Sequence, residues 1–345
     1  MSRSGLTVAI AGCGLIGRKR AGVLGPTDTL LGATDVIAER AADLVAAYGG
    51  VACRTFDELL GLGADVVIVS AIHDTLAPLT ERALAAGAHV LVEKPAGLGT
   101  AEIDALINAA ASSAGRVKVG FNHRFHPAIA ELAEEVHAGE HGDLMHLRAR
   151  YGHGGRPGYD QEWRSQPALS GGGELIDQGM HLLDLTRWIA GPLRLHSAML
   201  RTHFWDTRVE DNAALILGEG DTRTGPWAML HVTWTEWKNL FSIEVYCKTA
   251  KLQVDGLVRS YGPQTLRIYR MSPRLGPPEL EERAYGTDDL SWAAEWEHFA
   301  SGIRNGHPLL GDLDDARYAW SIVEQAYSSS PAYSGMREPD VRWDR

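Results

Sequence analysis

The feature that most constrains this chain is a glycine-rich turn between a predicted strand and a predicted helix. Residues 6–11 form an apolar run typical of a strand buried on both faces, and residues 18–24 are compatible with a helix. The turn between them consists of Gly12, Cys13, Gly14, Leu15, Ile16 and Gly17. In such a turn the first glycine permits the bend, the second lets the backbone approach a pyrophosphate, and the third lets helix pack on strand. The pattern predicts a dinucleotide-binding domain.

A second apolar run ends at Asp35. A carboxylate at this place can accept hydrogen bonds from both ribose hydroxyls of NAD and would repel the 2′-phosphate of NADP. Val36 and Ile37 follow it, so the closest arginine that could hold a phosphate is Arg40. We therefore expect NAD as the cofactor, with NADP the less favoured alternative.

Strands and helices alternate through the rest of the first third. Strands are predicted at 65–70, 88–92 and 116–120, and helices at 57–60, 77–86 and 100–111. This alternation indicates a doubly wound parallel sheet, whose ligands lie beyond the carboxyl ends of the strands. Lys94 follows one such end. It could hydrogen-bond a substrate hydroxyl and stabilise a developing alkoxide, or it could be a surface lysine in a turn.

Length and composition limit the possible functions. A chain of 345 residues is too long for one typical core. We expect a Rossmann domain at 1–123 and an α+β domain at 124–345. The net charge of −11 argues against nucleic-acid binding. Three scattered cysteines suggest neither a disulfide framework nor a metal site, and the apolar run at 6–16 is too short to span a bilayer, so a cytoplasmic protein with no membrane partner is expected.

A second chemical motif follows the glycines Gly171, Gly172 and Gly173. A helical pattern there would place Asp177, His181 and Asp184 on one side, at i, i+4 and i+7. A carboxylate one turn from a histidine can fix its tautomer, as a general acid–base requires near neutral pH. The alternative is a buried helix with a structural polar stripe. Asp184 is expected to support the helix rather than to react.

The second domain is predicted to be rich in strands. Candidates lie at 142–151, 193–204, 212–217, 227–236, 241–247 and 251–255, with helices at 127–137, 289–303 and 312–327. One-sided alternation fits an antiparallel sheet with one covered face. Residues 152–173 form a long loop, locally basic through Arg156 and Arg164 among others. These arginines could hold an anionic substrate, or they could be ordinary loop charges, and Trp163 could pack over cofactor or sugar.

Four motifs in order resemble the Gfo/Idh/MocA oxidoreductases over nearly the whole chain. They are the glycine turn, Glu93-Lys94-Pro95, the run Gly-Phe-Asn-His-Arg-Phe-His-Pro at 120–127, and the glycines followed by Asp177 and His181. The resemblance implies a Rossmann domain followed by a domain with a large, mostly antiparallel sheet. It implies catalytic roles for Lys94, Asp177 and His181, and assembly of homodimers or homotetramers through the second sheet. Either His181 or Lys94 could accept the hydroxyl proton.

The motifs, the basic loop and the resemblance together indicate the binding residues. Cofactor contacts are expected from Gly12, Cys13, Gly14, Leu15, Ile16, Gly17, Asp35, Ser70, Ala71, His73, Glu93 and Lys94. Substrate contacts are expected from Lys94, Asn122, Arg124, Arg156, Trp163, Arg164, Asp177 and His181. Many members carry Thr-Pro-x-x-x-His where this chain has Ala71-Ile72-His73-Asp74-Thr75-Leu76, which leaves the nicotinamide contacts in doubt. No metal is expected, because no ligand cluster is evident beyond the Asp177–His181 pair.

These observations predict an NAD-dependent dehydrogenase that oxidises a secondary hydroxyl of a sugar, nucleotide sugar or cyclitol. One alternative is an NAD-dependent glycosidase or related sugar oxidoreductase that recycles its cofactor. The other is a non-enzymatic regulator that senses a sugar or a dinucleotide. The presence of Lys94, Asp177 and His181 argues against the regulator, which need not retain them.

Overall fold

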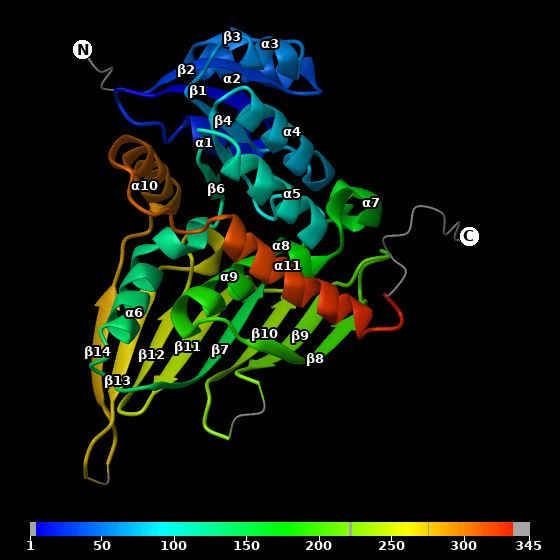
Figure 1. Cartoon of the computed structure of the whole chain (residues 1–345). Coiled ribbons are helices and arrows are strands. Elements are labelled where there is room, and N and C mark those ends of the chain that lie inside the picture. The colour runs from blue at the N-terminus through cyan, green and yellow to red at the C-terminus, as the bar shows by residue number, and fades with distance from the viewer. Residues whose placement is uncertain (1–4, 221–222, 275, 334–345) are drawn as a thin grey trace. The chain divides into compact units, whose positions relative to one another are not determined.

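The computed structural model describes residues 5–220, 223–274 and 276–333, and Figure 1 shows its elements. The chain forms two compact units. The first contains the described residues up to Asn122 together with Ser291–Arg317, and the second contains His123–Leu290 and the described residues from Tyr318 onward. In the described part of the chain, no helix has the length and apolar character needed to cross a membrane.

The first unit is built on a six-stranded parallel sheet in the order β3-β2-β1-β4-β5-β6. Its strands are β1 (Thr7–Ala11), β2 (Thr29–Thr34), β3 (Val51–Ala52), β4 (Val66–Val69), β5 (His89–Val92) and β6 (Val117–Val119). Strands β1 and β4 are buried along their whole length, as their continuous apolar sequence predicts. The strand order reverses between β1 and β4, which is where such sheets bind a nucleotide.

Five helices connect these strands, and the predicted parallel, doubly wound arrangement is confirmed. They are α1 (Leu15–Ala21), α2 (Ala38–Tyr48), α3 (Phe56–Leu60), α4 (His73–Ala85) and α5 (Thr100–Ala111). Helix α4 begins at His73, four residues earlier than the sequence pattern indicated, and contains Pro78 in its second turn. The proline has no N–H to donate to the carbonyl of Asp74, so the helix lacks one i→i−4 hydrogen bond in its second turn.

The first unit also includes a segment that the division at residue 123 assigned to the second domain. Helix α10 (Ser291–Asn305) places Trp296, Phe299 and Ala300 in the same apolar core as Val8 and Ile10 of β1. The structure thus places 291–317 in the first unit, whereas the described residues from Tyr318 onward lie in the second. Because α10 and β1 are far apart in the sequence, neither segment carries a local sequence pattern that predicts their contact.

The second unit contains an eight-stranded sheet in the order β14-β13-β12-β11-β7-β10-β9-β8. The strands are β7 (Leu144–Gly152), β8 (Arg194–Arg201), β9 (Asn212–Gly218), β10 (Trp227–Thr233), β11 (Leu240–Cys247), β12 (Ala250–Asp255), β13 (Thr265–Arg270) and β14 (Glu279–Ala284). Only the β7–β10 pair is parallel, so the predicted mostly antiparallel sheet is confirmed. The sequence analysis missed β13 and β14. Strand β14 is a highly charged edge strand without an apolar face.

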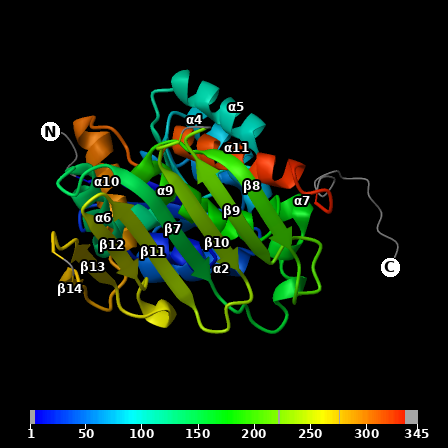
Figure 2. The same ribbon diagram turned by 90° about the horizontal axis from the view of Figure 1, so that it is seen from below.

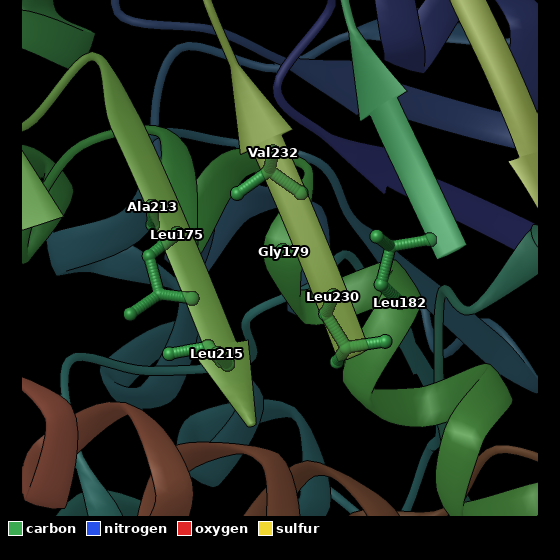
Figure 3. Close-up of a pocket in the computed structure, with 7 residues that line it drawn as sticks. All are labelled: Leu175, Gly179, Leu182, Ala213, Leu215, Leu230 and Val232. Carbon is green, nitrogen blue, oxygen red and sulfur yellow. The ribbon is translucent and has the colours of Figure 1, made fainter. Parts of the chain in front are cut away.

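Helices cover one face of this sheet, as Figure 2 shows from the side of the strands. Helix α6 (Pro127–His137) packs on β12 and β13, and α9 (Gly179–Ala190) packs on β7 and β10. Figure 3 shows the apolar contact between the helices α8 (Glu174–Asp177) and α9 and the strands β9 and β10. It is lined by Leu175, Gly179, Leu182, Ala213, Leu215, Leu230 and Val232. This packing fixes the helices that carry Asp177 and His181.

Candidate active site

The glycine turn of the first unit has the geometry of a pyrophosphate cradle. Gly12 has φ of +94°, and a Cβ there would lie 2.5 Å from the carbonyl oxygen of Ser70. A Cβ on Gly17 would lie 2.0 Å from the carbonyl oxygen of Gly12. Gly14 differs, because no described atom beyond its neighbours lies within 4 Å of the place of its Cβ. The first and third glycines are thus required by packing, and the second leaves its backbone open to a ligand.

Asp35 lies directly after β2 and is held by the same turn. Its carboxylate accepts hydrogen bonds from the backbone N–H of Cys13 at 2.7 Å and of Ile37 at 2.9 Å. Arg40 is half-exposed, and its guanidinium lies 3.9 Å from the carboxylate of Asp35. Burial, followed by the charge of Asp35, raises the pKa of the Cys13 thiol to about 12, so this thiol remains protonated and unreactive. The turn therefore presents a fixed carboxylate beside the cradle.

Replacing Asp35 by alanine is expected to weaken NAD binding and to narrow the preference for NAD over NADP. Loss of hydrogen bonds to a charged acceptor should raise the Kd for NAD by roughly ten- to a hundredfold. Fluorescence titration with each dinucleotide measures both constants. Asp43→Ala is the matched control, because Asp43 is an exposed partner of Arg18 outside the turn. Unchanged binding of both dinucleotides to the Asp35 variant would contradict the ribose assignment.

The loop after β4 is tied to the glycine turn. The hydroxyl of Ser70 donates to the carbonyl oxygen of Gly12 at 2.7 Å. Ala71 follows, and His73 begins α4 with its side chain buried. The departure from the family pattern in this loop thus leaves the attachment of Ser70 to the cradle in place.

Lys94 follows β5 and is joined to Pro95 by a cis peptide bond. The preceding Glu93 is buried, and its carboxylate accepts a hydrogen bond from Nε of Arg20 at 2.7 Å. Arg20 also pairs with Glu295 of α10 at 2.6 Å. The buried pair of Glu93 and Arg20 anchors the turn that carries Lys94. Asn122, likewise buried, donates from its amide to Ser291 at 2.9 Å.

In the second unit, the expected single helix is two helices. Helix α8 ends at Asp177 and α9 begins at Gly179, with Gln178 between them. The break coincides with Gly179, whose Cβ would lie 2.9 Å from Leu175. Glycine is a poor helix former, which favours an interruption of the helix at this place. Gln178 itself keeps a right-handed helical conformation, with φ of −95° and ψ of −30°, so Asp177 and His181 remain about one turn apart across the break.

The glycines before α8 are clamped by Glu210 and Tyr327. The carboxylate of Glu210 accepts from the backbone N–H of Leu175 at 2.9 Å and of Gly173 at 3.2 Å, and the Tyr327 hydroxyl donates to it at 2.9 Å. A Cβ on Gly173 would lie 2.0 Å from the carbonyl oxygen of Glu210. Glycine is thus required here because a side chain would displace the clamp.

Burial raises the pKa of Glu210 to about 7 despite the hydrogen bonds that lower it. Because this pKa is higher in the folded than in the unfolded chain, the native state loses stability as pH rises from about 4.5 to about 7. Glu210→Gln should remove this pH-dependent part, on the order of 3 kcal/mol. Urea unfolding of wild type and variant at pH 5 and pH 8 measures it. Glu140→Gln, at an exposed position, should leave the pH dependence unchanged.

Three tyrosines, of which Tyr151 and Tyr159 are buried and Tyr261 is half-buried, lie near Asp177 and His181. Burial is the main cause that raises the pKa values of Tyr151, Tyr159 and Tyr261, and the negative charges of Asp177 and Glu174 raise them further. The pKa of Tyr261 is raised to about 12, so its phenol stays protonated at neutral pH. The rings of Tyr151 and His181 have centroids 6.4 Å apart. Asp177 and His181 therefore border a common group of phenols, although their helices differ.

The arginines predicted to bind substrate have carboxylate partners within the second unit. Arg164 pairs with Asp177 at 3.3 Å, and its guanidinium lies 4.6 Å from the ring centroid of Trp163. Arg156 pairs with Glu162 at 2.5 Å. Arg124 makes a buried two-point contact with Asp184, with Nε to Oδ2 at 2.8 Å. The basic character of the loop thus does not indicate an anionic substrate, since nearby carboxylates compensate its charges.

One group of side chains in the described chain has ligand atoms close enough to surround a cation. These atoms of His153, Glu174 and Asp177 all lie within 4.8 Å of one another, although the sequence suggested no such cluster. However, Nδ1 of His153 accepts a hydrogen bond from the N–H of Gly155 at 2.9 Å. A neutral imidazole that accepts at Nδ1 carries its proton on Nε2, whereas metal-bound histidines donate from their other nitrogen. With Nδ1 accepting from the Gly155 N–H, His153 could not bind a cation through that nitrogen in this conformation.

The sequence analysis did not select several residues that complete this region. His123, Tyr151, Tyr261, Glu210 and Tyr327 come from five separate segments. His123 stands inside the motif at 120–127, which was the only local signal. The others could not be found from the sequence, because only the folded sheet brings them to the two helices.

The fold and the cradle define a class of protein, the Rossmann-type oxidoreductases that carry a second α+β domain. Residues 6–121 match the oxidoreductase family with an NAD-binding Rossmann fold, and residues 129–253 match the GFO/IDH/MocA C-terminal domain. The chain belongs to the Gfo/Idh/MocA family, as its motifs indicated, and its first unit is an NAD-binding domain. The glycine cradle and the carboxylate of Asp35 fit that cofactor.

Two relatives with known activities are similar over most of their length. The chain is 28% identical to inositol 2-dehydrogenase of Rhizobium meliloti, covering 93% of this chain and 95% of that protein. It is also 28% identical to the dTDP-3,4-didehydro-2,6-dideoxy-alpha-D-glucose 3-reductase of Streptomyces violaceoruber, covering 87% and 85%. Among solved structures, GenD2 from gentamicin A biosynthesis, in complex with NAD, is 26% identical with a TM-score of 0.80 and covers 94% of this chain and 93% of its own.

Proposed function

We propose that this protein is an NAD-dependent dehydrogenase that oxidises a secondary hydroxyl of a sugar, nucleotide sugar or cyclitol. The observation that carries the proposal is the buried polar group around His181 in a chain whose other unit binds NAD. Burying an imidazole among phenols and carboxylates costs folding free energy. Such groups of buried titratable side chains cluster at catalytic sites. The activities of the relatives named above support a hydroxylated carbon as the reacting centre.

The proposed reaction divides its tasks among three residues. When bound, NAD supplies the acceptor for the hydride that leaves the carbinol carbon. His181 accepts the hydroxyl proton as that bond breaks, and Lys94 donates a hydrogen bond to the same oxygen and stabilises its negative charge. Asp177 orients the substrate from the end of α8, where Arg164 fixes its carboxylate.

The test is NADH formation by the wild-type protein, followed by absorbance, with NAD and a panel of inositols, free sugars and nucleotide sugars. NADH formation that Lys94→Ala abolishes would establish the dehydrogenase and its substrate class together. No net NADH from a protein that retains tightly bound dinucleotide would favour the glycosidase with recycled cofactor. Absence of both turnover and dinucleotide binding would refute the proposal and favour a regulator.

We also propose that the chain forms homodimers or homotetramers through the uncovered face of its second sheet. Trp227 and Met229 of β10 and Met199 of β8 point to that face and are 40%, 41% and 58% exposed. His146 of β7 stacks on Trp227 with ring centroids 5.1 Å apart. Exposed apolar side chains gathered on one sheet face mark an interaction surface.

Met229→Glu is expected to convert the assembly to monomers, because it would bury a charge in the proposed interface. Light scattering coupled to size-exclusion chromatography measures the mass. Met145→Glu is the matched control, since Met145 is 43% exposed but shares its side of β7 with the buried Leu147. A Met229 variant that retains the wild-type mass, or a monomeric wild type, would contradict this interface.

The three buried cysteines are all unpaired thiols, consistent with a reducing compartment such as the cytosol.

A further inference from the structure

His181 is in face-to-face contact with a second histidine. The ring of His123 lies with its centroid 3.8 Å from that of His181, and the two ring planes differ by 20°. Both side chains are buried, 6% and 7% exposed. His123 belongs to the short helix Asn122–Phe125, whereas His181 is in the first turn of α9. Two segments far apart in the sequence thus bring two ionisable rings into van der Waals contact.

Hydrogen bonds hold the outer ring of this stack. Nε2 of His123 lies 3.2 Å from the hydroxyl of Tyr151. The ring of Tyr151 also contacts that of Tyr261, with centroids 5.4 Å apart, and the Tyr261 hydroxyl accepts from the side-chain amide of Gln178 at 3.1 Å. Burial raises the pKa of Tyr151 far above its ordinary value, so its phenol stays neutral over the physiological range. His123 is therefore fixed in its stacked orientation by neutral neighbours.

Charged and titratable groups approach the pair from several elements. Asp177 and Glu174 of α8 act on Tyr151, and Arg164 is paired with Asp177. Asp184, one turn after His181, is neutralised by Arg124. His126 meets His123 edge-on at 5.4 Å, with its own Nδ1 at 4.0 Å from Asp289. Asp177 and Asp184 each pair with an arginine, so the negative charge around the two imidazoles is partly compensated.

Two imidazolium charges at this distance repel each other strongly in a buried environment, where water screens them poorly. Binding of the first proton therefore lowers the affinity of the other ring for a second proton, and the two rings titrate as one coupled system. The stack also excludes direct proton exchange, because the N–H groups lie in the ring planes and the rings meet face to face. A proton on one ring acts on the other only through its charge.

We propose that His123 and His181 form a coupled pair that holds a single proton, so that His123 is a positioning residue which decides when His181 can accept one. The second part rests on the function proposed above. In the oxidation, the O–H bond of the substrate breaks and an N–H bond forms on His181, while the hydride electrons go to NAD. His123 must be neutral at that moment. Protonation of either ring blocks the reaction.

The test is a pH titration of the histidine Cε1–H resonances by NMR with ¹³C-labelled histidine. Both His123 and His181 should show two separated inflections in the wild-type protein. His123→Phe keeps an aromatic ring in the stack but cannot take a proton, so His181 should then titrate in one step. His181→Phe should do the same for His123 and also identifies the resonance. Either variant suffices if the other does not fold.

His137→Phe, at an exposed position on α6, is the matched control and should leave both titration curves unchanged. A role limited to packing would alter the melting temperature of the variants but not the number of titration steps. Single inflections in the wild type with midpoints unchanged in the variants would overturn the proposal, as would a pair that takes up no proton before the protein unfolds. This measurement needs no turnover, so failure of the dehydrogenase assay and failure of the coupled pair are seen separately.

Discussion

Replacing His181 by glutamine is expected to reduce turnover by roughly 10²–10⁴-fold, the contribution typical of general acid–base catalysis. Glutamine approximates the size of histidine and can still hydrogen-bond a substrate hydroxyl, but it cannot accept the proton. The loss should therefore fall on kcat, whereas the Kd for NAD should stay near the wild-type value. Steady-state rates of NADH formation and fluorescence titration with NAD measure the two quantities.

The matched control is His137→Gln, which changes an exposed histidine of α6 in the same unit. It should leave kcat and KM unchanged. If His181→Gln retained turnover within a few-fold of the wild type, His181 would not be the base. Lys94 would then be the better candidate for the proton acceptor, the alternative that the sequence leaves open.

The architecture of the first unit could be predicted because its determinants are local. The buried strands β1 and β4 are continuous apolar runs, and the turn from Gly12 to Gly17 lies between strand and helix, where its glycines have defined steric roles. The attachment of α10 could not be predicted. It combines the packing of Trp296 and Phe299 in the core of β1 with the pairing of Arg20 and Glu295, and nothing in either local sequence identifies the partner.

The geometry around the predicted site residues could not be predicted from the sequence. The spacing of Asp177 and His181 indicated one continuous helix, whereas the structure has two helices with Gln178 between them. The neighbour of His181 is instead His123, which the fold supplies from another segment. Periodicity describes contacts within an element, whereas catalytic geometry depends on contacts between elements.

The loop arginines show that local charge in the sequence, like periodicity, does not reveal contacts between elements. From the sequence, Arg156 and Arg164 made the loop basic and weakly favoured an anionic substrate. In the folded unit, Glu162 pairs with both, and Asp177 pairs with Arg164. A local excess of positive residues predicts an anion site only if no carboxylate from elsewhere reaches it.

Replacing Lys94 by methionine is expected to reduce turnover by roughly 10²–10³-fold, the effect typical of removing one donor to a developing oxyanion. Methionine retains a long unbranched side chain, so the loss reports the missing ammonium group. Because the buried pair of Glu93 and Arg20 is unaffected, the turn after β5 should keep its conformation. Equal losses in kcat and in kcat/KM would show that Lys94 acts in the transition state, whereas a rise in KM alone would show that it only binds substrate.

Chemical rescue separates the charge of Lys94 from its other possible roles. In Lys94→Ala, which leaves space, small primary amines such as methylamine should restore part of the lost turnover, because their ammonium ions can donate to the same oxygen. The matched control is Lys248→Met, which removes an exposed lysine paired with Asp143 at 2.5 Å in the second unit and should leave turnover unchanged. If Lys94→Met kept the wild-type kcat, the ammonium group of Lys94 would not stabilise the alkoxide, and the proposed role of Lys94 would be wrong. His181 would then have to supply both the hydrogen bond and the base, and the loss in His181→Gln would have to reach the upper end of its expected range.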